Sequence, residues 1–230
     1  MDDRRGGGHR PAGRGGRHPP APGPPPPLTE CRPALRGGAL HGGSRRRNTT
    51  DTATDYGWGR QMKATEVLAD GFGRIREAVH EAVGGLAAEQ LNARPGPEAN
   101  SISWLVWHLT RIQDDHVADV AGQEQVWRSA GWADRFALPL PAADHGYGHT
   151  AEQAASVRVG SADLLLGYYD AVHEQSLRFV RGLAAADLER IVDERWDPPV
   201  TLGVRLVSVL ADDLQHAGQA AYVRGLLERR

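Results

Sequence analysis

The fold of this protein is decided by residues 202–227, which read LGVRLVSVLADDLQHAGQAAYVRGLL. The stretch contains no proline, and its apolar residues recur every three or four positions, a pattern that predicts one long amphipathic helix. The preceding Trp196-Asp-Pro-Pro199 reads as a rigid turn, because proline is poorly tolerated inside a helix. We therefore expect a helix of about seven turns that begins near Leu202.

Three more stretches show the same periodicity, and residues that start or stop helices bound them. Asn100 or Ser101 precedes one and Ser161 another, and such side chains accept hydrogen bonds from free backbone N–H groups in the first turn. Gly84-Gly85 and Gly122 follow two of them, and glycine readily ends a helix. The sequence therefore predicts long helices at about residues 64–83, 101–121 and 161–182.

A long connection, residues 123–160, joins the second and third of these helices. It contains Pro139, Pro141 and a Gly146–Gly148 turn, all of which interrupt regular structure. No alternation of polar and apolar residues predicts a strand. The sequence therefore predicts an all-α fold, a four-helix bundle with one long crossover. Shorter helices are expected at residues 87–91, 151–156 and 187–192.

Residues 1–61 differ from the rest of the chain in composition. They hold most of the 15 prolines, many of the 28 glycines and a dense set of arginines, with few apolar side chains. Such a segment cannot bury enough apolar surface to offset the chain entropy lost on folding. The sequence therefore predicts a disordered tail at residues 1–61 and one folded domain at residues 62–230.

Charge and cysteine content narrow the classes of function. The whole chain has a net charge of −2, and because arginines crowd the tail, the folded domain is acidic, which argues against a nucleic-acid-binding surface there. Cys31 is the single cysteine and lies in the tail, so no disulfide forms within the chain and the domain has no cysteine ligand. No apolar run is long enough to span a membrane and no signal peptide is evident, so we expect a cytoplasmic protein without a membrane partner.

Two polar residues interrupt the apolar face of the helix at residues 202–227. Asp212 and His216 are four residues apart, so they stand one above the other on a face that also carries Val209. We expect this face to point inward, where an ionised carboxylate needs a partner. A carboxylate and an imidazole at this spacing can chelate one divalent cation. His108, on the buried side of the second long helix, is the expected third ligand.

Other interpretations of the same residues stay open at this point. A single histidine on an apolar face is more often a core residue with satisfied hydrogen bonds, and an aspartate four residues before a histidine is often a surface pair. His116 is a rival ligand on nearly the same side of its helix as His108, but it sits about 12 Å further along the axis. Asp213, three residues before His216, is a less favoured substitute for Asp212.

Two motifs resemble those of the DinB-like superfamily. They are NSISWLVWHL at residues 100–109 and DDLQHAGQ at residues 212–219. The superfamily includes mycothiol- and bacillithiol-dependent S-transferases and the mycothiol-dependent maleylpyruvate isomerase. The resemblance covers nearly all of residues 62–230, and the stretch WDPPVTLGVRLVSV, which starts at Trp196, is similar to an actinobacterial branch.

The resemblance implies an up-down-down-up four-helix bundle that holds one divalent metal, commonly zinc or nickel. It maps the family's second-helix histidine onto His108, and the pair on the fourth helix onto Asp212 and His216. That pair is usually His-x-x-x-His, or Glu-x-x-x-His in the mycothiol-dependent isomerase. Since aspartate is one methylene shorter than glutamate, we expect the ion to shift or to meet this carboxylate through water.

Other side chains are weaker candidates. Arg111 and Arg205 could recognise a carboxylate on a substrate, and Trp104 is expected in the core or in the wall of a pocket. His145 and His149 flank the glycine turn of the long connection. They could cover the site as a lid, but exposure to solvent is the favoured interpretation.

With the resemblance, the sequence predicts a metal-dependent thiol S-transferase or isomerase. A low-molecular-weight thiol such as mycothiol would bind the metal, its pKa would fall, and the thiolate would attack a small electrophile. The alternative is a non-catalytic, stress-associated metal-binding protein that uses the bundle surface to form a homodimer. The fold by itself does not decide between the two.

Overall fold

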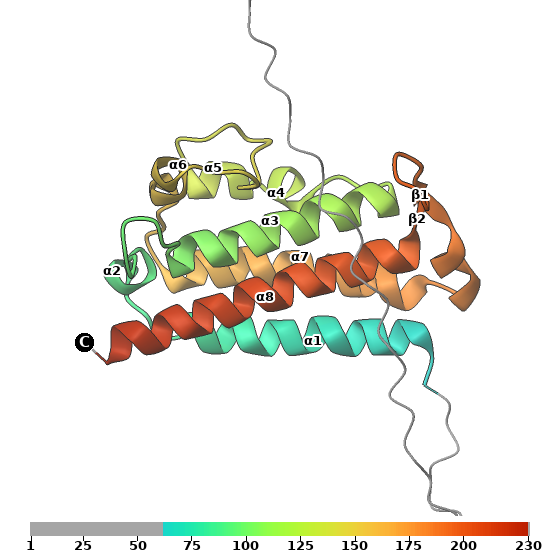
Figure 1. Ribbon diagram of the computed structural model, residues 1–230, viewed down its shortest axis with the longest axis horizontal. Helices are drawn as coiled ribbons and strands as arrows, with labels where there is room; N and C mark the ends of the chain where they lie inside the picture. The colour runs from blue at the N-terminus through green and yellow to red at the C-terminus, as the bar shows by residue number, and fades with distance from the viewer. Residues whose placement is uncertain (1–61, 230) are drawn as a thin grey trace, which may run out of the picture. The chain divides into compact units, whose positions relative to one another are not determined.

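Four long helices dominate the computed structural model of this chain (Figure 1), which describes residues 62–229. Their bounds agree with the predicted ones to within one residue, and the predicted all-α bundle is confirmed. The tail expected at residues 1–61 lies outside the described residues. The helices are α1 (Ala64–Val83), α3 (Ile102–Ala121), α7 (Ala162–Gly182) and α8 (Leu202–Glu228).

Helices α1 and α8 lie side by side and run parallel. Gly71 of α1 packs against the side chain of Leu210. Further along both helices, the guanidinium of Arg224 donates hydrogen bonds to the backbone carbonyls of Glu81 and Gly84. The order of these contacts along the two helices fixes their common direction.

Helix α3 runs antiparallel to α8 on its other side. The ring of His108 meets the ring of His216 near one end of the pair, and His116 is hydrogen-bonded to Arg205 nearer the other end. Helix α7 packs against both α1 and α3 and completes the bundle. This is the up-down-down-up order that the resemblance implied.

Polar caps fix where three of the long helices begin. Each of the three N-cap hydroxyls accepts a hydrogen bond from the backbone N–H three residues further on, which satisfies one free donor of the first turn. Gly122 ends α3 with a φ of 63°, a left-handed conformation that suits glycine. The N-caps are Ser101, Ser161 and Thr201.

The long crossover contains two helices that the sequence did not predict. The carboxylate of Asp114 on α3 accepts hydrogen bonds from the backbone N–H groups of Val126 and Trp127, both at 2.8 Å. It therefore caps a helix that begins twelve residues later in the chain. The two unexpected helices are α4 (Val126–Ser129) and α5 (Trp132–Phe136), and the expected short ones are α2 (Ala88–Leu91) and α6 (Ala151–Ser156).

A short ribbon replaces the helix expected at residues 187–192. A 3₁₀ turn, η1 (Ala185–Glu189), leads into strand β1 (Ile191–Asp193), which pairs antiparallel with β2 (Val200–Thr201). The pairing satisfies backbone groups that an isolated turn of helix would leave to solvent. The helix predicted at residues 187–192 is therefore present only as the 3₁₀ turn that ends at Glu189, and a strand stands in place of its second half.

The ribbon is attached to the bundle through a carboxylate. Asp193, at the end of β1, accepts hydrogen bonds from Arg195 at 2.8 Å and from Arg205 of α8 at 3.0 Å. These two arginines, Arg195 first, hold the pKa of the Asp193 carboxyl far below its usual range.

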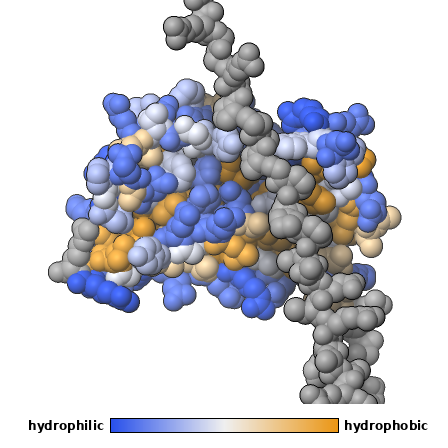
Figure 2. Space-filling model, in the orientation of Figure 1, coloured by the Kyte–Doolittle hydropathy of each residue, from blue (hydrophilic) through white to orange (hydrophobic). Residues whose placement is uncertain are grey.

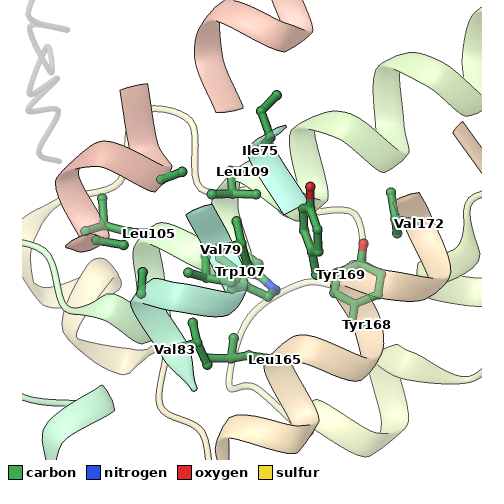
Figure 3. Packing of buried hydrophobic residues seen from close by; sticks show 14 of the residues in the cluster. Ile75, Val79, Val83, Leu105, Trp107, Leu109, Leu165, Tyr168, Tyr169 and Val172 are labelled. Atoms are coloured by element: carbon green, nitrogen blue, oxygen red, sulfur yellow. The ribbon is translucent and has the colours of Figure 1, made fainter. Parts of the chain in front are cut away.

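The core lies along the axis of the bundle, where side chains of α1, α3 and α7 interdigitate (Figure 3). The core side chains labelled in the figure include Ile75, Val79, Leu109, Leu165, Tyr169 and Val172, all essentially inaccessible to solvent.

No helix among the described residues is both long and apolar enough to cross a membrane.

Candidate metal centre

Three of the predicted site residues meet between α3 and α8. One potential ligand atom from each of His108, Asp212 and His216 lies within 4.8 Å of the other two. The Nε2 atom of His216 is 3.7 Å from Oδ1 of Asp212, and the rings of the two histidines stand nearly perpendicular with their centroids 4.8 Å apart. We call these three residues the ligand cluster.

Both histidines of the ligand cluster are held in the tautomer that a metal needs. The Nδ1–H of His108 donates a hydrogen bond to the backbone carbonyl of His145, and the Nδ1 of His216 is 2.8 Å from Oε1 of Gln219. Both partners accept hydrogen bonds, so each Nδ1 carries the proton and each Nε2 keeps its lone pair. A metal-binding histidine is usually oriented in this way through its second ring nitrogen.

The carboxylate of Asp212 has an oxygen that the protein leaves without a partner. Its Oδ2 atom is buried and forms no hydrogen bond among the described residues. A buried carboxylate oxygen without a partner is costly, and a cation would compensate it. Two imidazoles and one carboxylate suit a borderline divalent cation such as zinc. The residues present therefore fit a metal ion.

Burial also favours the form of His108 that can bind a metal. Its side chain lies in the core-facing part of α3, and the whole residue is only 5% exposed. Burial lowers the pKa of His108, and the neighbouring His216 contributes in the same direction. The neutral imidazole, which is the form that coordinates metals, is therefore retained at a lower pH than in a free histidine.

The face of α8 that points into the bundle is only partly the one predicted, because Val209 is buried as expected but Asp212 and His216 lie at the edge of that face. Its centre is Asp213, which is fully buried, whereas the side chains of Asp212 and His216 are 36% and 18% exposed at the α3 side of the helix. The apolar stripe from Leu206 through Val209 to Ala217 runs past Asp213 and could have shown this from the sequence. The ligand cluster therefore sits at the edge of the core, with an opening to solvent.

Asp213 is a buried acid, which the sequence analysis considered only as a less favoured substitute for Asp212. Neither of its carboxylate oxygens has a hydrogen-bond partner among the described residues. Burial raises the pKa of Asp213 well above its usual range, and the nearby charge of Asp212 adds to this. It lies outside the ligand cluster, so the cluster that forms uses Asp212 and not this alternative.

Trp104 and His149 form a wall beside the ligand cluster. The indole of Trp104 stacks on the ring of His108 with 4.6 Å between centroids, and its edge meets His216 at 6.0 Å. Its N–H donates a hydrogen bond to Nδ1 of His149, whose side chain is only 4% exposed. The favoured interpretation of His149 as a solvated residue was therefore wrong, because the crossover folds back over α3.

Arg111 is not placed to recognise a substrate. It is fully buried, and its guanidinium donates hydrogen bonds to the backbone carbonyl of Asp144 at 3.1 Å and to Gln125 at 3.0 Å. It also pairs with Asp114 at 3.6 Å and lies over the ring of Trp127. These contacts make Arg111 a support for the crossover, which corrects the expectation that it binds a carboxylate of a ligand.

Arg205 and His116 belong to a neighbouring pocket. Arg205 donates a hydrogen bond to Nδ1 of His116 at 2.9 Å as well as to Asp193. Together with Trp196 they line a pocket of about 340 Å³ at the ribbon end of the bundle. Arg205 precedes Asp212 by seven residues, about 10 Å along the helix, so it does not touch the ligand cluster directly. Burial, followed by the charge of Arg205, lowers the pKa of His116.

Comparisons with known proteins agree with this architecture. Residues 72–220 match the profile of the DinB superfamily, and this region contains the whole ligand cluster. Among solved structures, that of a conserved protein from Enterococcus faecalis is similar, with a TM-score of 0.70 and 32% sequence identity. The match covers 74% of this chain and 100% of that one. None of the curated proteins searched matches this chain.

Proposed function

The chain belongs to the DinB superfamily, and from this membership we propose that it is a metal-dependent thiol S-transferase or isomerase. The superfamily includes metal-dependent enzymes that use low-molecular-weight thiols. The observation that carries the proposal is the ligand cluster, in which one potential ligand atom from each of two histidines and a carboxylate lies within 4.8 Å of the other two, while Oδ2 of that carboxylate has no hydrogen-bond partner among the described residues. The proposal rests on this site because the fold alone does not specify a function.

His108, Asp212 and His216 would hold the ion, with zinc or nickel as the proposed metal. A divalent ion bound there would lower the pKa of an incoming thiol, so that a thiolate is available near neutral pH. Three protein ligands leave at least one position for that thiol on an ion of four to six ligands.

The surrounding residues would orient the thiol and limit access of water. Trp104 covers one side of His108, and His149 covers the indole in turn. The partly exposed Asp212 marks the side on which a small molecule can approach. One carboxylate among three ligands leaves the centre with a net positive charge, which favours a thiolate over a neutral thiol.

Mycothiol is the proposed thiol, with a small electrophile as the second substrate, in a cytoplasmic setting. The support is the similarity of the stretch that begins at Trp196 to an actinobacterial branch of the superfamily. That stretch includes Arg205 and lines the pocket at the ribbon end, about 10 Å from Asp212 along α8. A thiol with an extended polar body could reach from the ligand cluster into this pocket.

Cobalt substitution gives a direct test of the proposal. Addition of mycothiol to the cobalt-loaded protein should produce an intense sulfur-to-cobalt charge-transfer band in the near ultraviolet. An analogue in which the sulfur is replaced by oxygen is the control, and it should produce no such band. If mycothiol, bacillithiol and glutathione at millimolar concentration all leave the spectrum unchanged, the transferase proposal is wrong for this protein.

A second candidate function is a non-catalytic metal-binding protein that acts as a homodimer. Its support is the outer face of α8, where four large apolar side chains are at least half exposed, and where hydrophobic patches lie among polar ones in Figure 2. Sedimentation of the metal-loaded protein, together with the cobalt test, separates the candidates: a dimer that binds metal but no thiol favours the second. The exposed residues are Val204, Val207, Leu214 and Tyr222.

A further inference from the structure

Residues 144–149 of the crossover lie directly against a metal ligand. The backbone carbonyl of His145 accepts the hydrogen bond from Nδ1–H of His108. Gly146 follows, with a φ of 91°, and it approaches α3 so closely that a Cβ atom there would lie 2.8 Å from Nδ1 of His108 and 3.0 Å from the ring of Trp107. The contact depends both on the left-handed backbone and on the missing side chain of this glycine.

The carboxylate of Asp144 holds this turn in shape. It accepts a hydrogen bond from the backbone N–H of Gly146 at 2.8 Å and pairs with Nε2 of His149 at 3.0 Å. Burial alone would raise the pKa of Asp144, but the bond from Gly146 and the pairing with His149 outweigh it, and the pKa is lowered. The carboxylate therefore ties the two ends of the glycine turn together.

The turn is also anchored to the bundle from both sides. Arg111 of α3, fully buried, donates a hydrogen bond to the backbone carbonyl of Asp144, and the indole N–H of Trp127 donates one to the carbonyl of Ala142. On the far side, Trp104 donates to His149. The carbonyl of His145 is thus held between anchors that belong to rigid elements.

We propose that Asp144, His145 and Gly146 form a positioning clamp for His108, in which Asp144 and Gly146 act through the His145 carbonyl to set the metal affinity of the ligand cluster. The inference deepens the proposed function and rests on it in one respect, namely that the cluster binds a metal. The clamp fixes the tautomer and the ring orientation of His108 before the ion arrives. Loss of such an outer contact typically weakens metal binding by about 10- to 100-fold.

Two glycines of the same turn provide a matched pair for the test. Gly146 and Gly148 both have positive φ values, 91° and 74°, so alanine introduces backbone strain at either position. Only at Gly146 does the new methyl group collide with His108, because a Cβ atom at Gly148 would meet nothing within 4 Å. A difference between the two variants therefore reports the contact with His108 and not the strain.

The first measurement is zinc affinity of the full-length protein, determined by competition with a chromophoric chelator. Gly146→Ala should bind zinc about 10- to 100-fold more weakly than wild type, whereas Gly148→Ala should stay close to wild type. Asp144→Ala is the second variant, and it should weaken zinc binding in the same range, so the test does not depend on correct folding of Gly146→Ala. Equal zinc affinity in wild type, Gly146→Ala and Asp144→Ala would overturn the inference.

The second measurement needs no metal and follows the tautomer of His108 in the apo-protein. Long-range ¹H–¹⁵N NMR correlations should show a single Nδ1–H tautomer in wild type and in Gly148→Ala. In Gly146→Ala and in Asp144→Ala the Nε2–H tautomer should become populated, a change that general destabilisation would not produce. A wild-type protein that binds neither zinc nor nickel would refute the proposed metal centre, whereas an unchanged tautomer in both clamp variants would refute the clamp alone.

Discussion

Helical geometry places Asp212 and His216 side by side, and the packing of α3 antiparallel to α8 places His108 next to them. The spacing of four residues could be recognised from the sequence, since it sets two side chains on one face of any helix. The carbonyl of His145 could not, because a backbone oxygen in a long connection carries no sequence signal. The mistaken preference for a solvated His149 had the same origin.

Removal of His216 should separate metal binding from folding. In His216→Ala we expect bound zinc to fall below roughly a tenth of the wild-type content, because only two ligands remain. The apo form should keep its helices and lose no more than about 1 kcal/mol of stability, since the core does not include this side chain. Elemental analysis and circular dichroism measure the two effects.

His173→Ala is a suitable control for that experiment. His173 is a buried histidine of α7 that stacks on Tyr169 and takes no part in the ligand cluster. This variant should keep its zinc even if its stability falls. An unfolded His216→Ala protein at room temperature would mean that the metal is structural, and the catalytic proposal would lose its support.

At the scale of elements, the bounds of a helix could be predicted from the sequence only where the capping residue lies next to that helix in the chain. Three of the four long helices carry their own N-caps, such as Ser161 at the start of α7, and α1 ends at Gly84, so these bounds could be read locally. Helix α4 takes its cap from Asp114 on another helix, and four residues are too few to show a periodicity. The ribbon was missed because β1 is formed only through pairing with residues 200–201.

The attachment of the ribbon to α8 should depend on pH. The pKa of Asp193 is lowered in the folded protein, so its carboxylate contributes stability above the unfolded pKa of about 4, and this contribution is lost as pH falls further. Asp193→Asn should therefore lower the melting temperature at pH 7, and its difference from wild type should shrink between pH 4 and pH 2. Thermal melts followed by circular dichroism across this range test the sign.

The neighbouring exposed Glu194 supplies the comparison for that variant. Glu194→Gln makes the same change of charge one residue away, and it should alter the melting temperature little at any pH. If Asp193→Asn and Glu194→Gln behave alike, the ion pairs with Arg195 and Arg205 do not stabilise the ribbon.

For the whole molecule, the division of the chain at Met62 stays a prediction. The core described here is built from residues of α1 onward, and the composition of residues 1–61 supports no core of its own. A protein that begins at Met62 should therefore have the melting temperature and the metal content of the full chain. Calorimetry and elemental analysis of the two forms test this prediction. A marked loss of melting temperature or of metal content on truncation would contradict the division of the chain at Met62.

The order of the helices in space could be predicted from the resemblance to the superfamily but not from the hydrophobic periodicity of the sequence. Periodicity predicts four amphipathic helices and one long crossover, but several bundle topologies satisfy both. What selects one is the set of contacts between distant residues, such as Arg224 with Gly84 and Arg205 with His116. Such contacts leave no trace in the local sequence of either partner.

The ligand cluster joins two points that are far apart along the chain. His108 and Asp212 are separated by roughly a hundred residues, and bringing the ends of such a loop together costs an unfolded chain on the order of 4 kcal/mol in entropy. An unfolded or nascent chain can therefore offer an ion little more than the local pair on α8. A metal ion at the proposed site would distinguish the finished bundle from its precursors, and because it would bind only the folded form, it would add to the stability of that form by mass action.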